Sequence, residues 1–171
     1  MNLTIYIAAS FKHLHGARLL GRELRKLGYK LLDWTEKASP PPGLTPAQRR
    51  IWMDTDQEGG QVYKFCRDAC AKADIVVYYG ESGQDAGVEV GIASASGAAI
   101  IGIRGPLEGA GLMLHGAVDV WTEEAESALA LLEKLARYGA MAFAVPENED
   151  PRILALAARI RDRNQSDRAS D

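Results

Sequence analysis

Cysteine is scarce in this chain: two residues in 171 exclude a scaffold held together by disulfides. No apolar run is long enough to span a bilayer, and the first residues lack the basic region and apolar stretch of a signal peptide. Basic residues are not in excess, because 20 Lys and Arg stand against 23 Asp and Glu, so the charge gives no indication of nucleic-acid binding. We therefore expect a protein of the cytoplasm, a reducing compartment, with neither nucleic acid nor membrane as a partner.

The composition is that of a globular protein, with 47% hydrophobic and 25% charged residues. Short apolar runs rich in β-forming residues alternate with segments of helical periodicity. The runs expected as strands are residues 3–9, 29–34, 75–79, 98–103 and 118–121. The segments expected as helices are residues 14–27, 46–58, 61–72, 88–96, 123–138 and 151–163.

This alternation predicts an α/β fold, a doubly wound parallel five-stranded sheet of flavodoxin-like topology with helices on both faces. Residues 1–138 are expected to form the single domain, and residues 139–171 a C-terminal extension made of a helix and a flexible tail. Local signals fix several ends. Gly28 and Gly97 are natural helix stops, Thr45 and Gln48 form a capping box, and Thr122 is expected to cap the helix that follows it.

The most informative segment runs from residue 74 to residue 97, where a buried strand leads into a Gly-rich loop and then a helix. Ligands of doubly wound sheets bind beyond the carboxyl ends of the strands, where this loop lies. We expect Glu89 in the first turn of the helix, ionised by the unpaired N–H groups and the dipole there. Asp85 lies four residues earlier. A fixed carboxylate with a second acid nearby suits attack on a sugar anomeric carbon.

A purely structural interpretation stays open, because acidic residues cap many helices. Tyr6 can equally be a core aromatic residue with a bonded hydroxyl. Trp34 and Trp52 can stack on a nucleobase or lie in the core. His13 and His15, or Cys66 and Cys70, have no further ligands placed near them, so no metal site is expected.

Four stretches give the chain a resemblance to the nucleoside 2-deoxyribosyltransferase family, including its relatives that hydrolyse deoxynucleoside 5′-monophosphates. They are TIYIAASF at residues 4–11, ADIVV at 73–77, GVEVGIA at 87–93 and, more loosely, LMLHGA at 112–117. The resemblance covers most of residues 3–135.

The resemblance implies roles for single residues. Glu89 matches the nucleophile that forms a glycosyl-enzyme, Tyr6 the tyrosine that orients it, and Asp74 an aspartate near the leaving base. Asp85 is a further candidate acid, although the family's acidic residue usually lies further upstream, where this chain has Ser82 and Gly83.

The resemblance also indicates residues that bind substrate. Met113 matches a segment that completes the adjacent subunit's site, which implies a homo-oligomer with sites near the subunit interfaces. The expected substrate-binding residues are Ser10, Phe11, Lys12, Ser82, Gly83, Gly87, Met113 and His115.

We therefore expect an enzyme that cleaves or transfers at the N-glycosidic bond of a 2′-deoxyribonucleoside or its 5′-monophosphate. It would use a glutamate-linked glycosyl-enzyme and need no cofactor or metal. One alternative is a hydrolase of another nucleotide, such as a nicotinamide dinucleotide. A second is a module that senses nucleotides without turnover, and a third, weaker one is a flavoprotein. Base, phosphorylation state and the choice between transfer and hydrolysis stay open.

Overall fold

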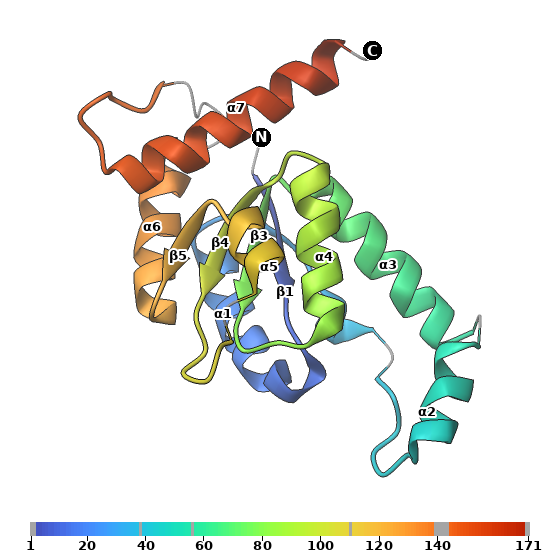
Figure 1. Cartoon of the computed structure of the whole chain (residues 1–171). Coiled ribbons are helices and arrows are strands. Elements are labelled where there is room, and N and C mark those ends of the chain that lie inside the picture. The colour runs from blue at the N-terminus through green and yellow to red at the C-terminus, as the bar shows by residue number, and fades with distance from the viewer. Residues whose placement is uncertain (1–2, 38, 56, 110, 139–143, 170–171) are drawn as a thin grey trace.

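A five-stranded parallel sheet forms the centre of the molecule (Figure 1). The computed structural model describes residues 3–37, 39–55, 57–109, 111–138 and 144–169. The strands are β1 (Thr4–Ala8), β2 (Lys30–Leu32), β3 (Ile75–Tyr79), β4 (Ala99–Ile103) and β5 (Val120–Thr122). Their order is β2-β1-β3-β4-β5, and each neighbouring pair is parallel. This order confirms the predicted doubly wound sheet of flavodoxin-like topology.

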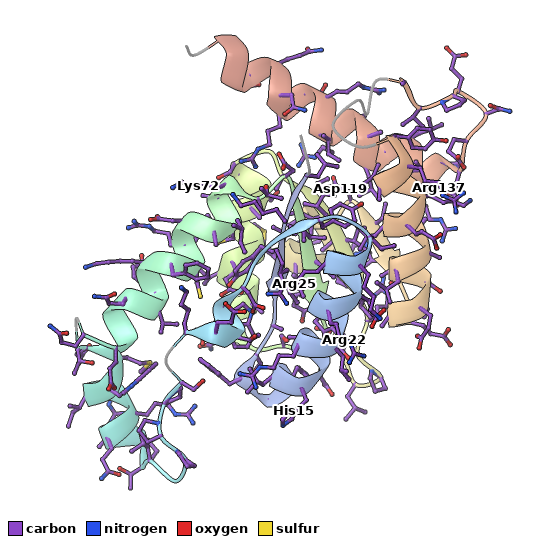
Figure 2. All side chains as sticks on the ribbon, turned by 180° about the vertical axis from the view of Figure 1, so that it is seen from behind. His15, Arg22, Arg25, Lys72, Asp119 and Arg137 are labelled. Atoms are coloured by element: carbon purple, nitrogen blue, oxygen red, sulfur yellow. The ribbon has the colours of Figure 1, made fainter. Side chains whose placement is uncertain are left out.

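Helices cover both faces of the sheet. The helical segments are η1 (Phe11–His13), α1 (Leu14–Lys26), η2 (Trp34–Glu36), α2 (Pro46–Met53), α3 (Gly59–Lys72), α4 (Gln84–Ala95), α5 (Leu112–Ala117), α6 (Ala125–Tyr138) and α7 (Pro151–Ala169). Helices α3, α4 and α5 pack side by side on one face, and α1 and α6 pack together on the other. Figure 2 looks onto the α1 and α6 face, where Arg22, Arg25 and Arg137 stand out as charged side chains. None of the helices in the described residues is both long and apolar enough to cross a membrane.

The core lies around the central strands. β3 and β4 are buried almost completely, because each has a strand on both edges and helices on both faces. From the helices, Leu24 of α1 and Leu132 and Leu135 of α6 are fully buried against this sheet. The sheet is therefore a rigid base from which loops at its carboxyl edge project.

The C-terminal extension packs into the same core. Ile153, Leu156 and Ile160 of α7 are fully buried. Arg163 donates to the carbonyls of Ala71 (2.8 Å) and Ser96 (3.2 Å) at the C-terminal ends of α3 and α4. Helix α7 therefore covers the amino-terminal edge of the sheet (Figure 1).

The helix end predicted at residue 163 is wrong, because α7 continues to Ala169. Its buried apolar face and the two hydrogen bonds of Arg163 hold the helix against the domain. The boundary predicted at residue 139 and the last two residues lie outside the described residues.

Three of the predicted local signals are confirmed, namely the two glycine helix stops and the capping box. Gly28 and Gly97 adopt positive φ angles of 88° and 77° after α1 and α4, as helix stops do. The Thr45–Gln48 capping box is present at the start of α2. Thr122, however, is the last residue of β5, and its hydroxyl faces the carbonyls of Gly102 and Glu124. It does not cap α6, which begins three residues later.

Two other predicted boundaries move. The second strand ends at Leu32, because Asp33 caps a short 3₁₀ turn that contains Trp34. Helix α3 begins at Gly59 rather than after the Gly59–Gly60 pair.

Candidate active site

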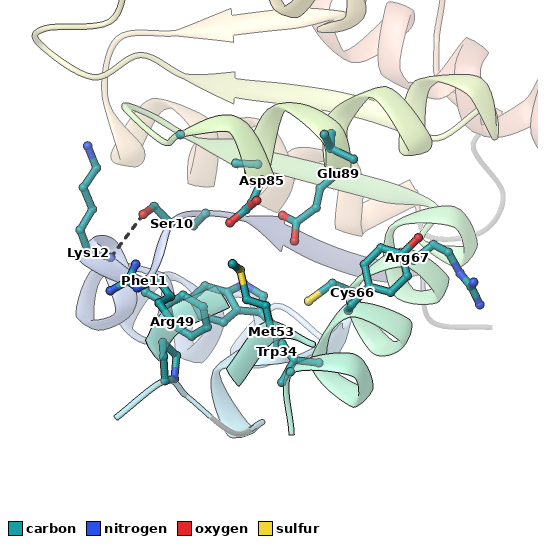
Figure 3. A pocket seen from close by; sticks show the side chains of 18 of the residues that line it. Ser10, Phe11, Lys12, Trp34, Arg49, Met53, Cys66, Arg67, Asp85 and Glu89 are labelled. Carbon is teal, nitrogen blue, oxygen red and sulfur yellow. Dashed lines mark hydrogen bonds between the residues drawn. The ribbon is translucent and has the colours of Figure 1, made fainter. Parts of the chain in front are cut away.

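A cavity of about 780 Å³ opens at the carboxyl edge of the sheet (Figure 3). Residues that follow β1, including Ser10 and Phe11, line one side, and Gly83 and Asp85, which follow β3, line another. The chain leaves β1 toward β2 but leaves β3 toward β4, so the two connections diverge here. This divergence is the switch point at which doubly wound sheets bind ligands.

Glu89 lies in the cavity wall and is tied to the sheet by Tyr6. The Tyr6 hydroxyl donates to Oε1 of Glu89 over 2.7 Å. Tyr6 itself is fully buried in the middle of β1, and burial together with the neighbouring Glu89 carboxylate raises its pKa far above the ordinary value. The hydroxyl therefore stays protonated and acts only as a hydrogen-bond donor to the carboxylate.

The predicted reason for the ionisation of Glu89 is wrong. Helix α4 begins at Gln84, four residues earlier than expected, so Asp85 occupies the first turn and Glu89 the second. Glu89 thus lies beyond the unpaired N–H groups of the helix end. Burial instead raises its pKa to about 7, the hydrogen bond from Tyr6 opposes this rise, and the charge of Asp85 adds to it. A carboxyl group with this pKa is about half ionised near neutral pH.

Asp85 lies one helical turn before Glu89 on the same face of α4. Figure 3 shows both carboxyl groups pointing from α4 into the cavity. Asp85 is exposed, whereas Glu89 is largely buried. The cavity wall therefore carries two carboxyl groups, one buried and one in contact with solvent.

Ser82 joins the loop after β3 to the loop after β1. Its hydroxyl accepts from the backbone N–H of Ser10 (2.9 Å) and donates to the carbonyl of Tyr79 (2.5 Å). The Tyr78 hydroxyl accepts from the N–H of Ser82 (3.1 Å) and donates to Oε1 of Glu108 (2.7 Å). Ser82 does not line the cavity; it fixes the position of Ser10, which does.

Aromatic and sulfur-containing side chains form the wall opposite α4. The rings of Phe11 and Trp34 meet edge to face at 5.1 Å, and the Trp34 indole donates to the carbonyl of Ile7 (2.8 Å). Trp52 and Met53 of α2 continue this wall, and Nε1 of Trp52 is buried without a hydrogen-bond partner among the described residues. Both tryptophans therefore line the cavity, and Trp34 is a core residue as well.

Three basic residues lie at the cavity. Arg67 pairs with Asp68 (2.7 Å). Lys12 and Arg49 form no ion pair within the described part of the chain. The Lys12 side chain extends away from Asp85 and Glu89 (Figure 3). Ser10, which was also predicted to bind substrate, caps η1, because its hydroxyl accepts from the backbone N–H of Lys12 (3.4 Å).

Asp74 does not belong to the site, which corrects its expected place near the leaving base. It precedes β3, and its Oδ2 accepts from the N–H (2.6 Å) and the hydroxyl (2.7 Å) of Thr4, which begins β1. These contacts place it at the amino-terminal edge of the sheet. A residue that precedes one parallel strand cannot reach a cavity beyond the other ends of the strands.

Four further predicted residues lie outside the cavity wall, and one of them is Tyr6, which is buried behind Glu89. Met113 is exposed on α5, the ring of His115 stacks on Trp121 at 6.1 Å, and Gly87 of α4 faces open space. The predicted residues that do line the cavity are Ser10, Phe11, Lys12, Gly83, Asp85 and Glu89.

Sequence reasoning missed the contribution of α2 and α3. Arg49, Met53 and Cys66 line the cavity, and the thiol of Cys66 lies against Tyr6 and Glu89. The Thr45 capping box predicted a helix there, but nothing in the sequence says which face of that helix turns toward the sheet. Within the described ranges, no three side chains of His, Cys, Asp or Glu are grouped to hold a metal ion.

Comparison with known proteins supports the fold. No family model and no curated protein matches the sequence. Among solved structures, a 2-deoxyribosyltransferase from Bacillus psychrosaccharolyticus is 20% identical, with a TM-score of 0.52 over 75% of this chain and 95% of that one. A conserved protein from Enterococcus faecalis V583 is 13% identical, with a TM-score of 0.60 over 78% and 99%.

A CMP N-glycosidase from Clostridium botulinum is 21% identical, with a TM-score of 0.46 over 77% and 98%. The TM-scores of the first two structures establish a shared α/β fold, and because all three identities are low, the chemistry has to be argued from the site.

Proposed function

We propose that the protein breaks the N-glycosidic bond of a 2′-deoxyribonucleoside or its 5′-monophosphate through a covalent intermediate on Glu89. The observation that carries this proposal is the hydrogen bond from Tyr6 to Glu89, which fixes a largely buried carboxylate in the wall of a ligand-sized cavity. The fold shared with a 2-deoxyribosyltransferase is consistent with it.

In the first step a carboxylate oxygen of Glu89 attacks C1′ of the sugar. The C1′–N bond breaks and its electron pair goes to the base, which takes a proton from Asp85 or from solvent. In the second step an acceptor base or water attacks C1′, and the ester bond to Glu89 breaks. The proton of the acceptor passes to Asp85 or solvent, so the carboxylate of Glu89 is restored.

The cavity suits such a substrate. Its volume of about 780 Å³ lies within the range of ligand sites, roughly 300–1,000 Å³. The aromatic wall of Phe11, Trp34 and Trp52 gives a base flat apolar surface. Lys12 and Arg49 add positive charge that can meet a phosphate.

We also propose a homo-oligomer whose contacts reach the site. Leu112 and Met113 on α5 are 86% and 84% exposed. Val88 on the adjoining α4 is 61% exposed and also lines the cavity. A second copy that covers this apolar surface would therefore contact the rim of the cavity.

Product chromatography tests the function. Wild type, Glu89→Ala and Glu89→Gln are incubated with deoxynucleosides and their 5′-monophosphates, with and without a free acceptor base. Glu133→Gln on α6, an exposed residue paired with Arg137 on the far face, is the matched control. Free base released by wild type and control alone is the expected result, and a new nucleoside in the acceptor lanes would identify transfer.

Two other outcomes would contradict the proposal. Turnover of a nicotinamide dinucleotide alone would assign a different nucleotide substrate. Binding of nucleotides without any product, retained in Glu89→Ala, would indicate a sensing module.

A further inference from the structure

Cys66 extends from α3 to the carboxyl group of Glu89. It lines the cavity, and Figure 3 shows its sulfur directed toward Glu89. The thiol lies close to both Glu89 and the Tyr6 hydroxyl, and its presence lowers the pKa of Glu89 against the larger opposing effect of burial. Three polar groups from β1, α3 and α4 therefore meet at one point.

The carboxyl group of Glu89 is only half satisfied without this thiol. Oε1 accepts from Tyr6, whereas Oε2 is buried and has no hydrogen-bond partner among the described residues. An ionised carboxylate oxygen that is buried without a donor is strongly unfavourable. The ionisable groups that face Glu89 are Tyr6 on β1, Cys66 and Cys70 on α3, and Asp85 on α4.

Only one of these groups is free to donate to Oε2. The Tyr6 hydroxyl is used by Oε1, Asp85 is an acceptor when ionised, and the Cys70 thiol donates to the carbonyl of Cys66 (2.8 Å). Burial raises the pKa of Cys66 to about 12, so this thiol keeps its hydrogen at neutral pH and is a poor nucleophile.

We propose that Cys66 is a positioning residue that donates its S–H hydrogen to Oε2 of Glu89 and, with Tyr6, holds the ionised carboxylate from both sides. Each carboxylate oxygen keeps a second lone pair, so the contact leaves Glu89 able to attack. The effect on catalysis rests on the function proposed above, whereas the hydrogen bond itself does not.

The direct test is the pKa of Glu89, read by carbon-13 NMR of protein labelled at the glutamate carboxyl carbons. The Glu89 signal is assigned by its loss in Glu89→Gln. Cys66→Val replaces the thiol by two methyl groups, which removes the donor and keeps the position apolar. Cys66→Ser keeps a donor, and Cys70→Ala, one turn along α3, is the matched control.

We expect the pKa of Glu89 to rise by about half a unit to one unit in Cys66→Val. It should stay at or below the wild-type value in Cys66→Ser and remain unchanged in Cys70→Ala. An equal pKa in Cys66→Val and wild type, or a rise in Cys66→Ser as large as in Cys66→Val, would overturn the proposal.

A second measurement needs no substitution at Cys66. In Cys70→Ala the single remaining S–H stretching band belongs to Cys66, and it should move to lower frequency as Glu89 ionises. A band that does not respond to pH between 5 and 9 (on the order of two units on each side of the pKa of Glu89) would also overturn the proposal.

Activity gives the third arm. If the protein turns over a nucleotide, the acidic limb of kcat/KM against pH should move up in Cys66→Val by the same shift that NMR reports, and serine should restore it. If no substrate is turned over, the proposed function fails, while the NMR and infrared arms still decide whether Cys66 holds Glu89.

Discussion

The hydroxyl of Tyr6 and Oε1 of Glu89 are 2.7 Å apart, although the two residues are 83 positions apart in the sequence. Tyr6 belongs to β1, an interior strand of the sheet, and Glu89 belongs to α4, a helix that packs on the sheet. The hydrogen bond therefore forms only when β1 and α4 are correctly packed. The geometry of the proposed nucleophile is therefore set by the packing of the core rather than by a mobile loop.

Tyr6→Phe should remove this bond without disturbing the core, because the ring keeps its buried position. A hydrogen bond to a charged group contributes about 1.5–3 kcal/mol, which corresponds to a loss of roughly 10- to 150-fold in kcat/KM. The pKa of Glu89 should rise as well. Steady-state kinetics over a range of pH check both effects, and an unchanged kcat/KM would contradict the orienting role of Tyr6.

The activity of the wild type should increase with pH through about 7 and level off above it, because Glu89 attacks only when ionised. Asp85→Asn should move this limb to lower pH, since the charge of Asp85 raises the pKa of Glu89. The measurement is kcat/KM against pH for both proteins. A limb that stays in place in the asparagine variant would show that Asp85 does not act on Glu89.

Glu89 should also make the free energy of unfolding depend on pH. Its folded-state pKa of about 7 lies above the ordinary value of 4.5, so the folded protein binds the proton more tightly than the unfolded chain. The contribution of Glu89 to stability is then greatest below about pH 4.5 and falls as pH rises to about 7, by on the order of 3 kcal/mol. Glu89→Gln should remove this fall. Urea unfolding at pH 4.5 and pH 8 tests the prediction, which fails if both proteins show the same pH dependence.

Asp74→Ala separates a structural carboxylate from a catalytic one. The loss of two hydrogen bonds to Thr4 should lower the free energy of unfolding by about 1–3 kcal/mol. The kcat/KM of the folded protein should stay near the wild-type value, because Asp74 lies at the opposite edge of the sheet. Denaturant unfolding and kinetics on the same preparation check the two effects. A large loss of kcat/KM at unchanged stability would instead indicate that Asp74 takes part in catalysis.

Leu156→Ala tests whether α7 belongs to the core of the domain. Leu156 is fully buried, and a cavity of this kind lowers stability by about 2–5 kcal/mol. Thermal or urea unfolding should show one cooperative transition shifted as a whole. A separate early transition of α7 would instead define the extension as an independent unit.

The fold was predictable because its signals are local. The apolar run of Ile75–Tyr79 defines a buried strand by itself, and Gly28 and Gly97 mark helix ends by backbone geometry. The rules for parallel sheets then limit the order of strands to a few arrangements. The start of α4 was missed because Gly83 at its N-terminus makes no side-chain cap that a sequence pattern could reveal.

The site was predictable only in part, because it depends on contacts between distant segments. Glu89, Tyr6 and Asp85 follow from the motif and the resemblance. The position of Asp74 depends on which edge of the sheet it occupies, and Cys66 reaches Glu89 only because α3 packs against α4. Neither the position of Asp74 nor the proximity of Cys66 to Glu89 can be predicted from the spacing of residues in the sequence.

The cavity is built from two kinds of segment, and their separation has an evolutionary consequence. Asp85 and Glu89 come from α4, which packs on the sheet, whereas Arg49, Trp52 and Met53 come from α2, a helix with no buried residue of its own. Mutations in α2 can thus accumulate without unfolding the domain. Substitutions there would reshape one wall of the cavity while Asp85, Glu89 and the hydrogen bond from Tyr6 keep their positions.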